Sequence, residues 1–370
     1  MAAMEPALVR IVEQVANAVS RRMALRIRGG GTKDFYGQCL QGSLLDMRAL
    51  AGVVAYEPSE LVVTARSGTP LQALEDLLAQ HGQCLPFEPP HFGSAATLGG
   101  MVAAGLSGPA RAFSGPLRDY VLGLQMINGK AEVLHFGGQV MKNVAGYDVS
   151  RLMVGALGVL GVITEVSLKV LPRATAQATL VFACSQVQAL RMLHGWAAEP
   201  LPLNASCWQA DDGGRLCLRL RGARAAVDAA CAGLGGEQLA DGVAADFWSG
   251  VREQTLPTFA LDPAQCLWRL SVPDTAPVLE LPAPVTAPLL EWGGALRWVR
   301  APITSSVALR AAVAAVGGTA SVFRRGSIAS GQEVTVFHPL PATNLRIQRA
   351  LKQQFDPAGI FNPARLYPEL

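Results

Sequence analysis

Apolar residues near the start of the chain recur every three or four positions, at Leu8, Val12, Val15 and Val19. This is the period of an α-helix with one apolar face, so we expect an amphipathic first helix. Glutamate and arginine residues interrupt the same stretch, which therefore lacks the uncharged core of a signal peptide.

Shorter apolar runs follow, and they predict buried strands at 24–28, 61–66 and 166–171. A helix is expected to begin at Pro70, with Thr69 as its cap, and to end at Gly82. Asn128 and Gly129 predict a tight turn that joins two further strands, VLGLQMI and KAEVLHFGG.

The pattern changes after Pro172 and divides the chain into three parts. Residues 1–172 are predicted to form a first domain. Residues 173–335 alternate short strands such as ATLVFAC with alanine-rich helices, and we expect a separate α+β domain there. Residues 336–370 hold one helix, which ends at Asp356 before a proline. The apolar face of this helix is expected to be Ile347, Leu351 and Phe355.

Composition narrows the classes of function. The chain has 370 residues, of which 50% are hydrophobic and 16% charged, against about a quarter charged in an average soluble protein. Such a surface suits burial against partner proteins, or it reflects a general bias toward alanine and leucine. The net charge of +3 does not favour nucleic acid or an anionic membrane. The longest uncharged run, 91–110, is too rich in glycine and proline for a membrane span.

The seven cysteines are scattered and form no Cys-x-x-Cys pair, so neither a zinc ribbon nor an iron–sulfur cluster is expected. An odd, dispersed set is typical of reduced thiols in a cytoplasmic protein. The six tryptophans lie between 196 and 298, where they either pack in the core or line a partner interface.

Three glycine-rich segments precede Pro172, at 28–33, 93–108 and 155–161. One such segment is commonly a turn without a ligand, but three in one domain favour a ligand. Glycine lets backbone N–H groups approach a phosphate, and small uncharged backbone suits a flat aromatic ring. The P-loop and the Rossmann fingerprint are both absent. A dinucleotide on another fold is therefore predicted.

Several motifs resemble a known family. RIRGGGT resembles the pyrophosphate loop of the vanillyl-alcohol-oxidase flavoproteins, also called the p-cresol methylhydroxylase (PCMH) type. GSAATLGGMVAAGLSG, SGPLRDYVLGL, NVAGYDVSRLMVGALGVLGVITEV and FDPAGIFNPARLY resemble, in order, the D-2-hydroxyacid dehydrogenase branch. The resemblance covers most of the first 172 residues and the last 28. It implies an α+β fold: a two-part PCMH-type FAD-binding domain, completed by 336–370, with a second, cap-like α+β domain.

The resemblance also implies which residues bind FAD. Those at the pyrophosphate are Arg28, Gly29, Gly30, Gly31, Thr32 and Lys33. Those beside it and the flavin ring are Gly93, Thr97, Leu98, Gly99, Gly100 and Gly105. Those at the ribityl or adenosine part are Gly158, Gly161, Val162 and Ile163. Arg28 and Lys33 either neutralise phosphate charge or are solvated residues at a strand end. Asp148 is expected to cap the helix that follows it.

Related oxidases attach flavin covalently to a histidine near the first loop. RGGGTK contains none, so the FAD is expected to be non-covalent. Gly105 stands where the family has an asparagine on the flavin side.

The chain also departs from the catalytic members of the family. They resemble one another in a His-x-x-x-Gly-Asn-x-His metal site and in a Gly-Glu-His-Gly segment that supplies a catalytic base. This chain has neither, and ahead of the last helix it reads GQEVTVFHPLPATN. No catalytic residue and no metal site can therefore be assigned. His338 is the nearest histidine, and His91 is either close to the flavin or a packing residue.

The whole chain resembles the FAD-binding subunits of bacterial glycolate oxidases. This implies a cytoplasmic complex, or one held peripherally at the inner membrane, that oxidises the small 2-hydroxy acid glycolate to glyoxylate. Its partners would be a catalytic FAD-containing subunit and an iron–sulfur subunit, and this chain would support the assembly or relay electrons. The alternatives are a self-sufficient oxidase or dehydrogenase of another 2-hydroxy acid or a sugar, and a flavin-free scaffold.

Overall fold

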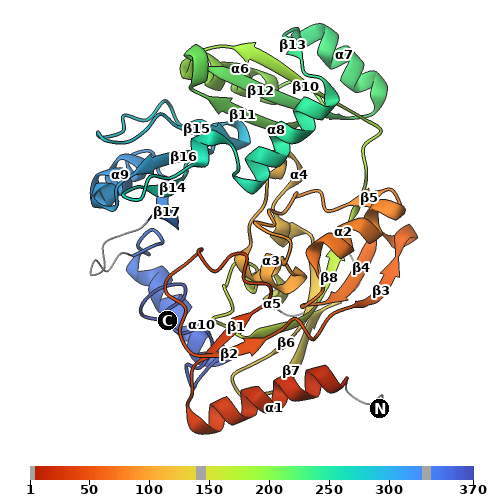
Figure 1. Ribbon diagram of the computed structural model, residues 1–370, viewed down its shortest axis with the longest axis vertical. Coiled ribbons are helices and arrows are strands. Elements are labelled where there is room, and N and C mark those ends of the chain that lie inside the picture. Colours follow the sequence, from red (N-terminus) through yellow and green to blue (C-terminus); the bar gives the residue numbers. More distant parts are fainter. Residues whose placement is uncertain (1–4, 139–146, 327–334) are drawn as a thin grey trace.

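The computed structural model describes residues 5–138, 147–326 and 335–370. The protein is elongated, and Figure 1 shows two units stacked along its long axis. The first unit contains the N-terminal elements and the last helix. The second contains the elements between Ala176 and Arg325.

A five-stranded antiparallel sheet forms the centre of the first unit, in the order β3-β4-β8-β6-β7. Its strands are β3 (Val53–Glu57), β4 (Val62–Arg66), β6 (Val121–Ile127), β7 (Val133–Gly137) and β8 (Val162–Lys169). The short elements around it are α4 (Arg111–Ser114), α5 (Val149–Leu152) and the paired strands β5 (Gln83–Cys84) and β9 (Leu171–Pro172).

Both faces of this sheet are covered. Helices α2 (Leu71–Gln80) and α3 (Leu98–Ala104) pack on one face, where Ile163 of β8 joins their core. The neighbouring Val162 points to the other face and packs in the core beneath α1 (Pro6–Arg21). Because successive residues of a strand alternate between faces, β8 reaches both cores. The first helix, predicted from its apolar spacing, is confirmed.

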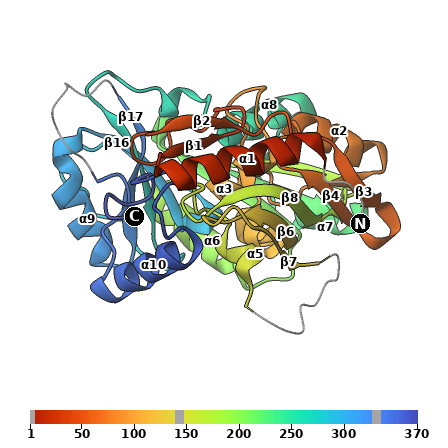
Figure 2. The same cartoon turned by 90° about the horizontal axis from the view of Figure 1, so that it is seen from below.

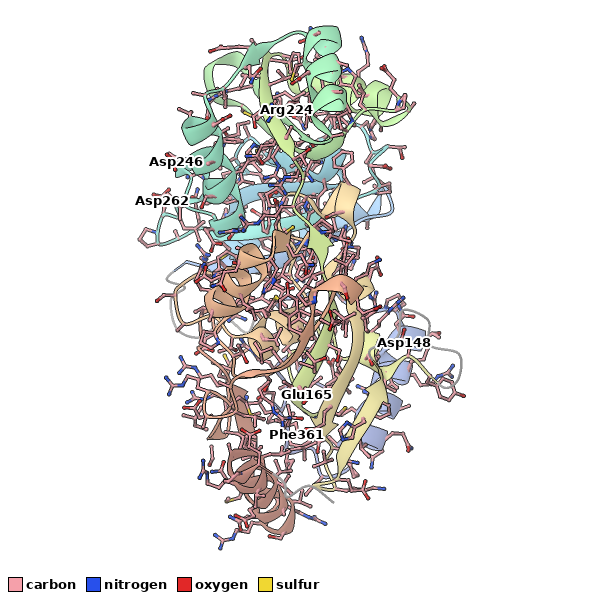
Figure 3. The ribbon with its side chains drawn as sticks, turned by 90° about the vertical axis from the view of Figure 1, so that its right-hand side faces the viewer. Asp148, Glu165, Arg224, Asp246, Asp262 and Phe361 are labelled. Carbon is pink, nitrogen blue, oxygen red and sulfur yellow. The ribbon has the colours of Figure 1, made fainter. Side chains whose placement is uncertain are left out.

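The C-terminal segment returns to the first unit. A parallel pair, β1 (Leu25–Arg28) and β2 (Ser43–Asp46), lies beneath α1. Leu25 donates its N–H to the Ile360 carbonyl at 2.7 Å and accepts from the Asn362 N–H at 2.9 Å. Figure 2 shows this pair directly behind α1, whereas α10 (Ala342–Phe355) lies apart from it, and Leu351 and Phe355 of α10 pack against the core that contains α2 and α3. Figure 3 places Phe361 in the same half of the molecule as Glu165 of β8.

An eight-stranded sheet forms the second unit, in the order β13-β10-β12-β11-β15-β16-β14-β17. Its strands are β10 (Ala176–Ala183), β11 (Leu203–Gln209), β12 (Arg215–Gly222), β13 (Glu237–Gln238), β14 (Cys266–Ser271), β15 (Leu289–Glu291), β16 (Leu296–Ala301) and β17 (Thr319–Arg325). Its helices are α6 (Gln186–Ala197), α7 (Arg224–Leu234), α8 (Asp241–Glu253) and α9 (Ser306–Ala314). Five of the six tryptophans are buried in its cores, which confirms the packing alternative for them.

One face of this sheet packs directly against the first unit. Trp298 and Phe323 of the sheet share an apolar core with Tyr36, Leu106 and Leu157 of the first unit. The two units are therefore joined by a continuous apolar interface.

Three local predictions are wrong. Thr69 does not cap α2, because its hydroxyl exchanges hydrogen bonds with the backbone of Gly52 instead. The β6–β7 connection is not a two-residue turn but a wider loop, 128–132, held by the Asn128 side chain. On α10, Leu351 and Phe355 pack against the core as predicted, but Ile347 is 53% exposed and Lys352 is buried instead.

Candidate cofactor-binding site

A cleft of about 810 Å³, partly open to solvent, lies between the loop after β1, the start of α3 and the segment that leads into β8. Twelve of the sixteen residues predicted to bind FAD line it. They are Arg28, Gly29, Gly30, Gly31, Thr32, Lys33, Thr97, Gly99, Gly100, Gly158, Gly161 and Ile163. Segments more than a hundred positions apart in the sequence thus meet at one cleft.

The other four predicted residues do not line this cleft. Leu98 and Val162 are fully buried in the two cores on either side of the sheet. Gly93 is exposed beside the first loop, where a Cβ would lie 3.2 Å from the Thr32 side chain. Gly105, with φ +65°, packs against the segment before β8 and does not line the cleft.

The loop after β1 offers a row of free donors. In the described parts of the chain, no hydrogen bond uses the backbone N–H groups of residues 29–33, although the residues on both sides are bonded. Successive free N–H groups form a concave site for anions. The loop therefore fits the phosphates of a dinucleotide, which carry only acceptor oxygens.

The glycines of the cleft are required by the protein itself. A Cβ on Gly30 would lie 1.5 Å from the Ala95 carbonyl oxygen, and one on Gly29 would lie 2.2 Å from Thr97 Oγ1. A Cβ on Gly99 would lie 2.6 Å from Ser67 Cβ. These positions let one backbone segment pass close to another, and this packing holds the free N–H groups of the loop in place.

The glycines before β8 allow the backbone of this segment to turn sharply beside the cleft. Gly155 and Gly158 have φ of +81° and +74°, a region that side chains with a Cβ rarely adopt. A Cβ on Gly158 would also lie 2.6 Å from Asn362 Nδ2. Residues 143–146, the beginning of the same motif, lie outside the described residues. Asp148 does cap the short helix α5, accepting from the Arg151 N–H at 3.1 Å.

Residues near the C-terminus complete the cleft, and the sequence did not single them out. Asn362 accepts from the Ile27 N–H at 2.8 Å and donates to the Leu157 carbonyl at 2.7 Å, so it joins two walls. Arg365 donates to the backbone carbonyls of Asp34, Tyr36 and Gln38 in the first loop. The FNPAR motif in the sequence could have pointed to these two residues. It did not, because their side chains contact backbone groups more than 300 positions away, which a local motif does not reveal.

A buried ion pair anchors this C-terminal segment. Lys352 Nζ lies 2.7 Å from Asp356 Oδ2 and also donates to the carbonyls of Val159 and Phe361. Asp356 in turn accepts from the N–H groups of Ile360 and Phe361. The pair therefore fixes the backbone on both sides of the cleft.

Positive charge predominates at the mouth of the cleft. Arg28 pairs with Asp34 at 2.7 Å, which leaves Lys33 and Arg365 without a carboxylate partner among the described residues. Burial lowers the pKa of Lys33 to about 8 and that of Arg365 to about 10. Both remain mostly protonated at neutral pH, so an anion there is favoured.

One further polar atom has no partner. Ser67 lines the cleft, and its buried hydroxyl makes no hydrogen bond with any described residue. A buried hydroxyl left unpaired costs about 1–3 kcal/mol, so a ligand that bonds it would gain affinity.

Neither candidate histidine lies at this cleft. His91 Nε2 is 3.0 Å from Glu75 Oε2, and its backbone N–H donates to Glu253, so it packs between α2 and α8. His338 accepts from the Ala320 N–H beside β17. Among the residues that the structure describes, no group of three His, Cys, Asp or Glu side chains is placed to hold a metal ion. None of the helices in the described ranges is long and apolar enough to cross a membrane.

Comparisons with known proteins agree with this geometry. The family model described as "FAD binding domain" matches residues 7–137. The chain is 47% identical over 360 residues to the glycolate oxidase subunit GlcE of Escherichia coli (strain K12), covering 97% of each chain. It is 28% identical over 170 residues to the glycolate oxidase subunit GlcD of Bacillus subtilis (strain 168), covering 45% of this chain and 36% of that one.

A solved structure of alkyldihydroxyacetonephosphate synthase superposes with a TM-score of 0.67 at 16% identity, over 96% of this chain and 75% of that chain. The predicted α+β fold with a PCMH-type FAD-binding domain is confirmed, and FAD is a cofactor of this chain.

Proposed function

Because this chain belongs to the family of the glycolate oxidase subunit GlcE, we propose that it is the FAD-binding subunit of a complex that oxidises glycolate to glyoxylate. The observation that carries the proposal is the row of unused N–H donors at residues 29–33, inside a cleft lined by the glycine-rich segments. Bound there, FAD supplies an acceptor for a hydride or for electrons.

The chain's own residues account for binding in two parts. The N–H groups of the first loop, with Arg28 and Lys33 beside them, hold the phosphates. The apolar part of the cleft, with Ile27, Met47 and Leu157, shields the uncharged part of the cofactor from water. The first loop, RGGGTK, contains no histidine for a covalent link, so in our proposal the FAD is held non-covalently.

This chain does not carry the catalytic base in our proposal. Oxidation of a 2-hydroxy acid needs a group that removes the hydroxyl proton, and His91 and His338 are both engaged elsewhere. The base therefore comes from a catalytic FAD-containing subunit, and an iron–sulfur subunit takes the electrons onward. This chain's flavin relays electrons or stabilises the assembly.

The division of labour can be tested by dye reduction with glycolate. The purified chain alone is expected to give no appreciable turnover, and activity is expected when the two partner subunits are co-expressed. Rapid turnover by the chain alone would instead favour a self-sufficient oxidase. Acid precipitation of the purified chain should leave a yellow supernatant, because the flavin is not covalently attached.

Ser67→Ala tests the cofactor site without disturbing the protein's own contacts. The Ser67 hydroxyl has no partner in the described chain, so its removal should not lower stability. If it bonds FAD, the dissociation constant of FAD should rise about fivefold, as for a hydrogen bond worth about 1 kcal/mol. Ser20→Ala, on the exposed side of α1, is the matched control. Equal FAD affinity in both variants would mean that the hydroxyl does not face the cofactor.

A further inference from the structure

The end of α8, in the second unit, contacts the first unit next to the FAD cleft. Glu253 is the last residue of this helix, and Figure 1 shows α8 on the side of the second unit that faces the first. Its carboxylate accepts from the backbone N–H groups of Phe92 at 2.7 Å and His91 at 3.1 Å. These residues directly precede Gly93, which lies beside Thr32 of the first loop. The described residues that line the cleft include none from α8, so any effect of Glu253 on FAD is indirect.

Helix stability does not explain a carboxylate at this position. The C-terminal end of an α-helix carries partial negative charge, so a glutamate there is unfavourable for the helix itself. Arg252 offsets part of this cost by donating to Glu253 Oε1 at 2.8 Å. The other oxygen, Oε2, accepts from both N–H groups of the 91–92 turn. The position of Glu253 is therefore explained by its contact with the first unit.

The turn that Glu253 holds is strained. Phe92 has a φ of +53°, a region that residues with a Cβ rarely adopt and keep only when their surroundings hold them there. The hydrogen bond to Glu253 is one such restraint. Contacts of the Phe92 ring with Phe35 and Phe323, at 5.4 and 6.0 Å between ring centres, are others. Without the carboxylate, the backbone of this turn should relax.

The same turn supports the loop that would hold the phosphates. Lys33 Nζ donates to the His91 carbonyl at 3.2 Å and lies 5.6 Å from the centre of the Phe92 ring. Three residues after Phe92, the Ala95 carbonyl passes so close to Gly30 that a Cβ there would lie 1.5 Å from its oxygen. A shift of the turn would therefore displace Lys33 and loosen the packing that holds the free N–H groups of the loop.

Glu253 also affects the charge of Lys33. Burial lowers the pKa of Lys33 to about 8, and the negative charge of Glu253 opposes this effect by raising that pKa. Among the described residues Glu253 pairs with Arg252 and not with Lys33, so this is a longer-range effect of charge. A lysine that keeps its proton keeps its attraction for phosphate oxygens.

We propose that Glu253 is a positioning residue for FAD: from the second unit it holds the 91–93 turn against the first loop and supplies the negative charge that faces Lys33. The second unit thereby takes part in forming a cofactor site whose walls belong to the first. The proposal concerns FAD binding by this chain alone and does not depend on the reaction that the complex carries out.

Two variants separate the turn from the charge. Glu253→Ala removes both, and the dissociation constant of FAD should rise about tenfold, as for one lost hydrogen bond to a charged group. Glu253→Gln keeps an oxygen that can accept from both N–H groups but carries no charge. Glu237→Gln is the matched control, because Glu237 is exposed on β13 at the edge of the second sheet. Equal FAD affinity in the alanine variant and the control would overturn the proposal.

The effect of the charge is tested by flavin titration between about pH 6 and pH 8. Affinity in the unaltered protein should fall as the pH rises toward about 8, because Lys33 loses its proton. In Glu253→Gln this fall should begin at lower pH, so the ratio of the two dissociation constants should grow about threefold across the range, the effect of one partly screened charge. Both proteins share the other charged and titratable groups around Lys33, which are Arg28, Asp34, His91, Arg324 and Arg365.

A Lys33→Met background shows whether the effect passes through Lys33. There, Glu253→Gln should leave the pH dependence of FAD binding unchanged, because the group on which its charge acts is gone. An equal change of the pH dependence with and without Lys33, or no change in either background, would overturn the assigned role of the charge.

A measurement on the unaltered protein covers the case in which a variant does not fold. Hydrogen exchange followed by mass spectrometry reports the protection of backbone N–H groups with and without FAD. Because coupling between two sites is reciprocal, FAD should slow exchange at His91 and Phe92 and in the last turn of α8, and leave α7 unchanged. Exchange that FAD does not alter in the 91–92 turn or in α8 would refute the proposal.

Discussion

Removing one member of the buried Lys352–Asp356 pair should destabilise the FAD cleft more than any surface substitution. Asp356 is 1% exposed and accepts three hydrogen bonds, from Lys352 and from the N–H groups of Ile360 and Phe361. Asp356→Asn leaves the Lys352 ammonium buried without a counter-ion. Breaking a buried pair in this way costs about 3–5 kcal/mol.

Lys352→Met, which removes the other member of the pair, should lower the free energy of unfolding by a similar amount. It removes the donor to the carbonyls of Val159 and Phe361 and leaves the Asp356 carboxylate unpaired. In the double variant no unpaired charge remains. Its cost should therefore fall below the sum of the two single costs by about 0.5–3 kcal/mol, the range found for groups in direct contact.

The assay is urea unfolding followed by two signals. All six tryptophans lie in the second unit, so their emission reports on that unit, whereas release of flavin reports on the cleft. The flavin midpoint should fall in each single variant, with a smaller change in the tryptophan midpoint. Strict additivity of the two substitutions, or a loss seen only in the tryptophan signal, would refute the reasoning.

Three other outcomes are expected. Burial raises the pKa of Glu291 to about 7, so between pH 4.5 and 7 the folded state keeps a proton that the unfolded state has lost. The free energy of unfolding should therefore fall with rising pH in this window, by about 3 kcal/mol at most. Calorimetric melting of Glu291→Gln should lose that part of the slope, and an unchanged slope would contradict the assignment. Gly30→Ala should lower the melting temperature of the FAD-free protein as well as FAD content, because its Cβ meets the Ala95 carbonyl rather than a ligand; normal FAD-free stability would show that the loop can move aside. Arg28→Met should weaken FAD binding less at 0.5 M salt than at 0.05 M salt, measured by flavin titration, because a charge–charge contribution to binding is screened by salt.

The sequence predicted the parts of this structure that depend on local pattern. The first helix, the β1 strand and its glycine loop are all continuous stretches whose spacing or motif is visible in one window. The predicted apolar face of α10 is confirmed at Leu351 and Phe355 but wrong at Ile347, for a physical reason. Pattern analysis assumes that lysine is exposed and isoleucine buried, whereas here the Asp356 partner allows Lys352 to be buried and Ile347 faces solvent.

Contacts between distant segments could not be predicted in the same way. Asn362 and Arg365 contact the first loop across more than 300 positions, and nothing in FNPAR specifies which backbone groups they reach. Likewise, Arg111 and Arg269 come from different units, and only the fold brings them to one indole ring. The close contact between Gly30 and the Ala95 carbonyl could not be predicted either, because a glycine-rich motif does not show which atoms lie next to each glycine Cα.

The backbone hydrogen bonds between β1 and residues 360–362 have a consequence for synthesis of the protein. The bond from Ile27 to Asn362 spans 335 positions, so a chain growing on the ribosome cannot finish the FAD cleft until residue 362 has emerged. Contacts of such long range also close slowly, because the intervening chain must first be ordered. Cofactor loading is thus coupled to near-complete translation. A chain released early would fold parts of both units yet stay colourless, and flavin content would distinguish finished chains from truncated ones.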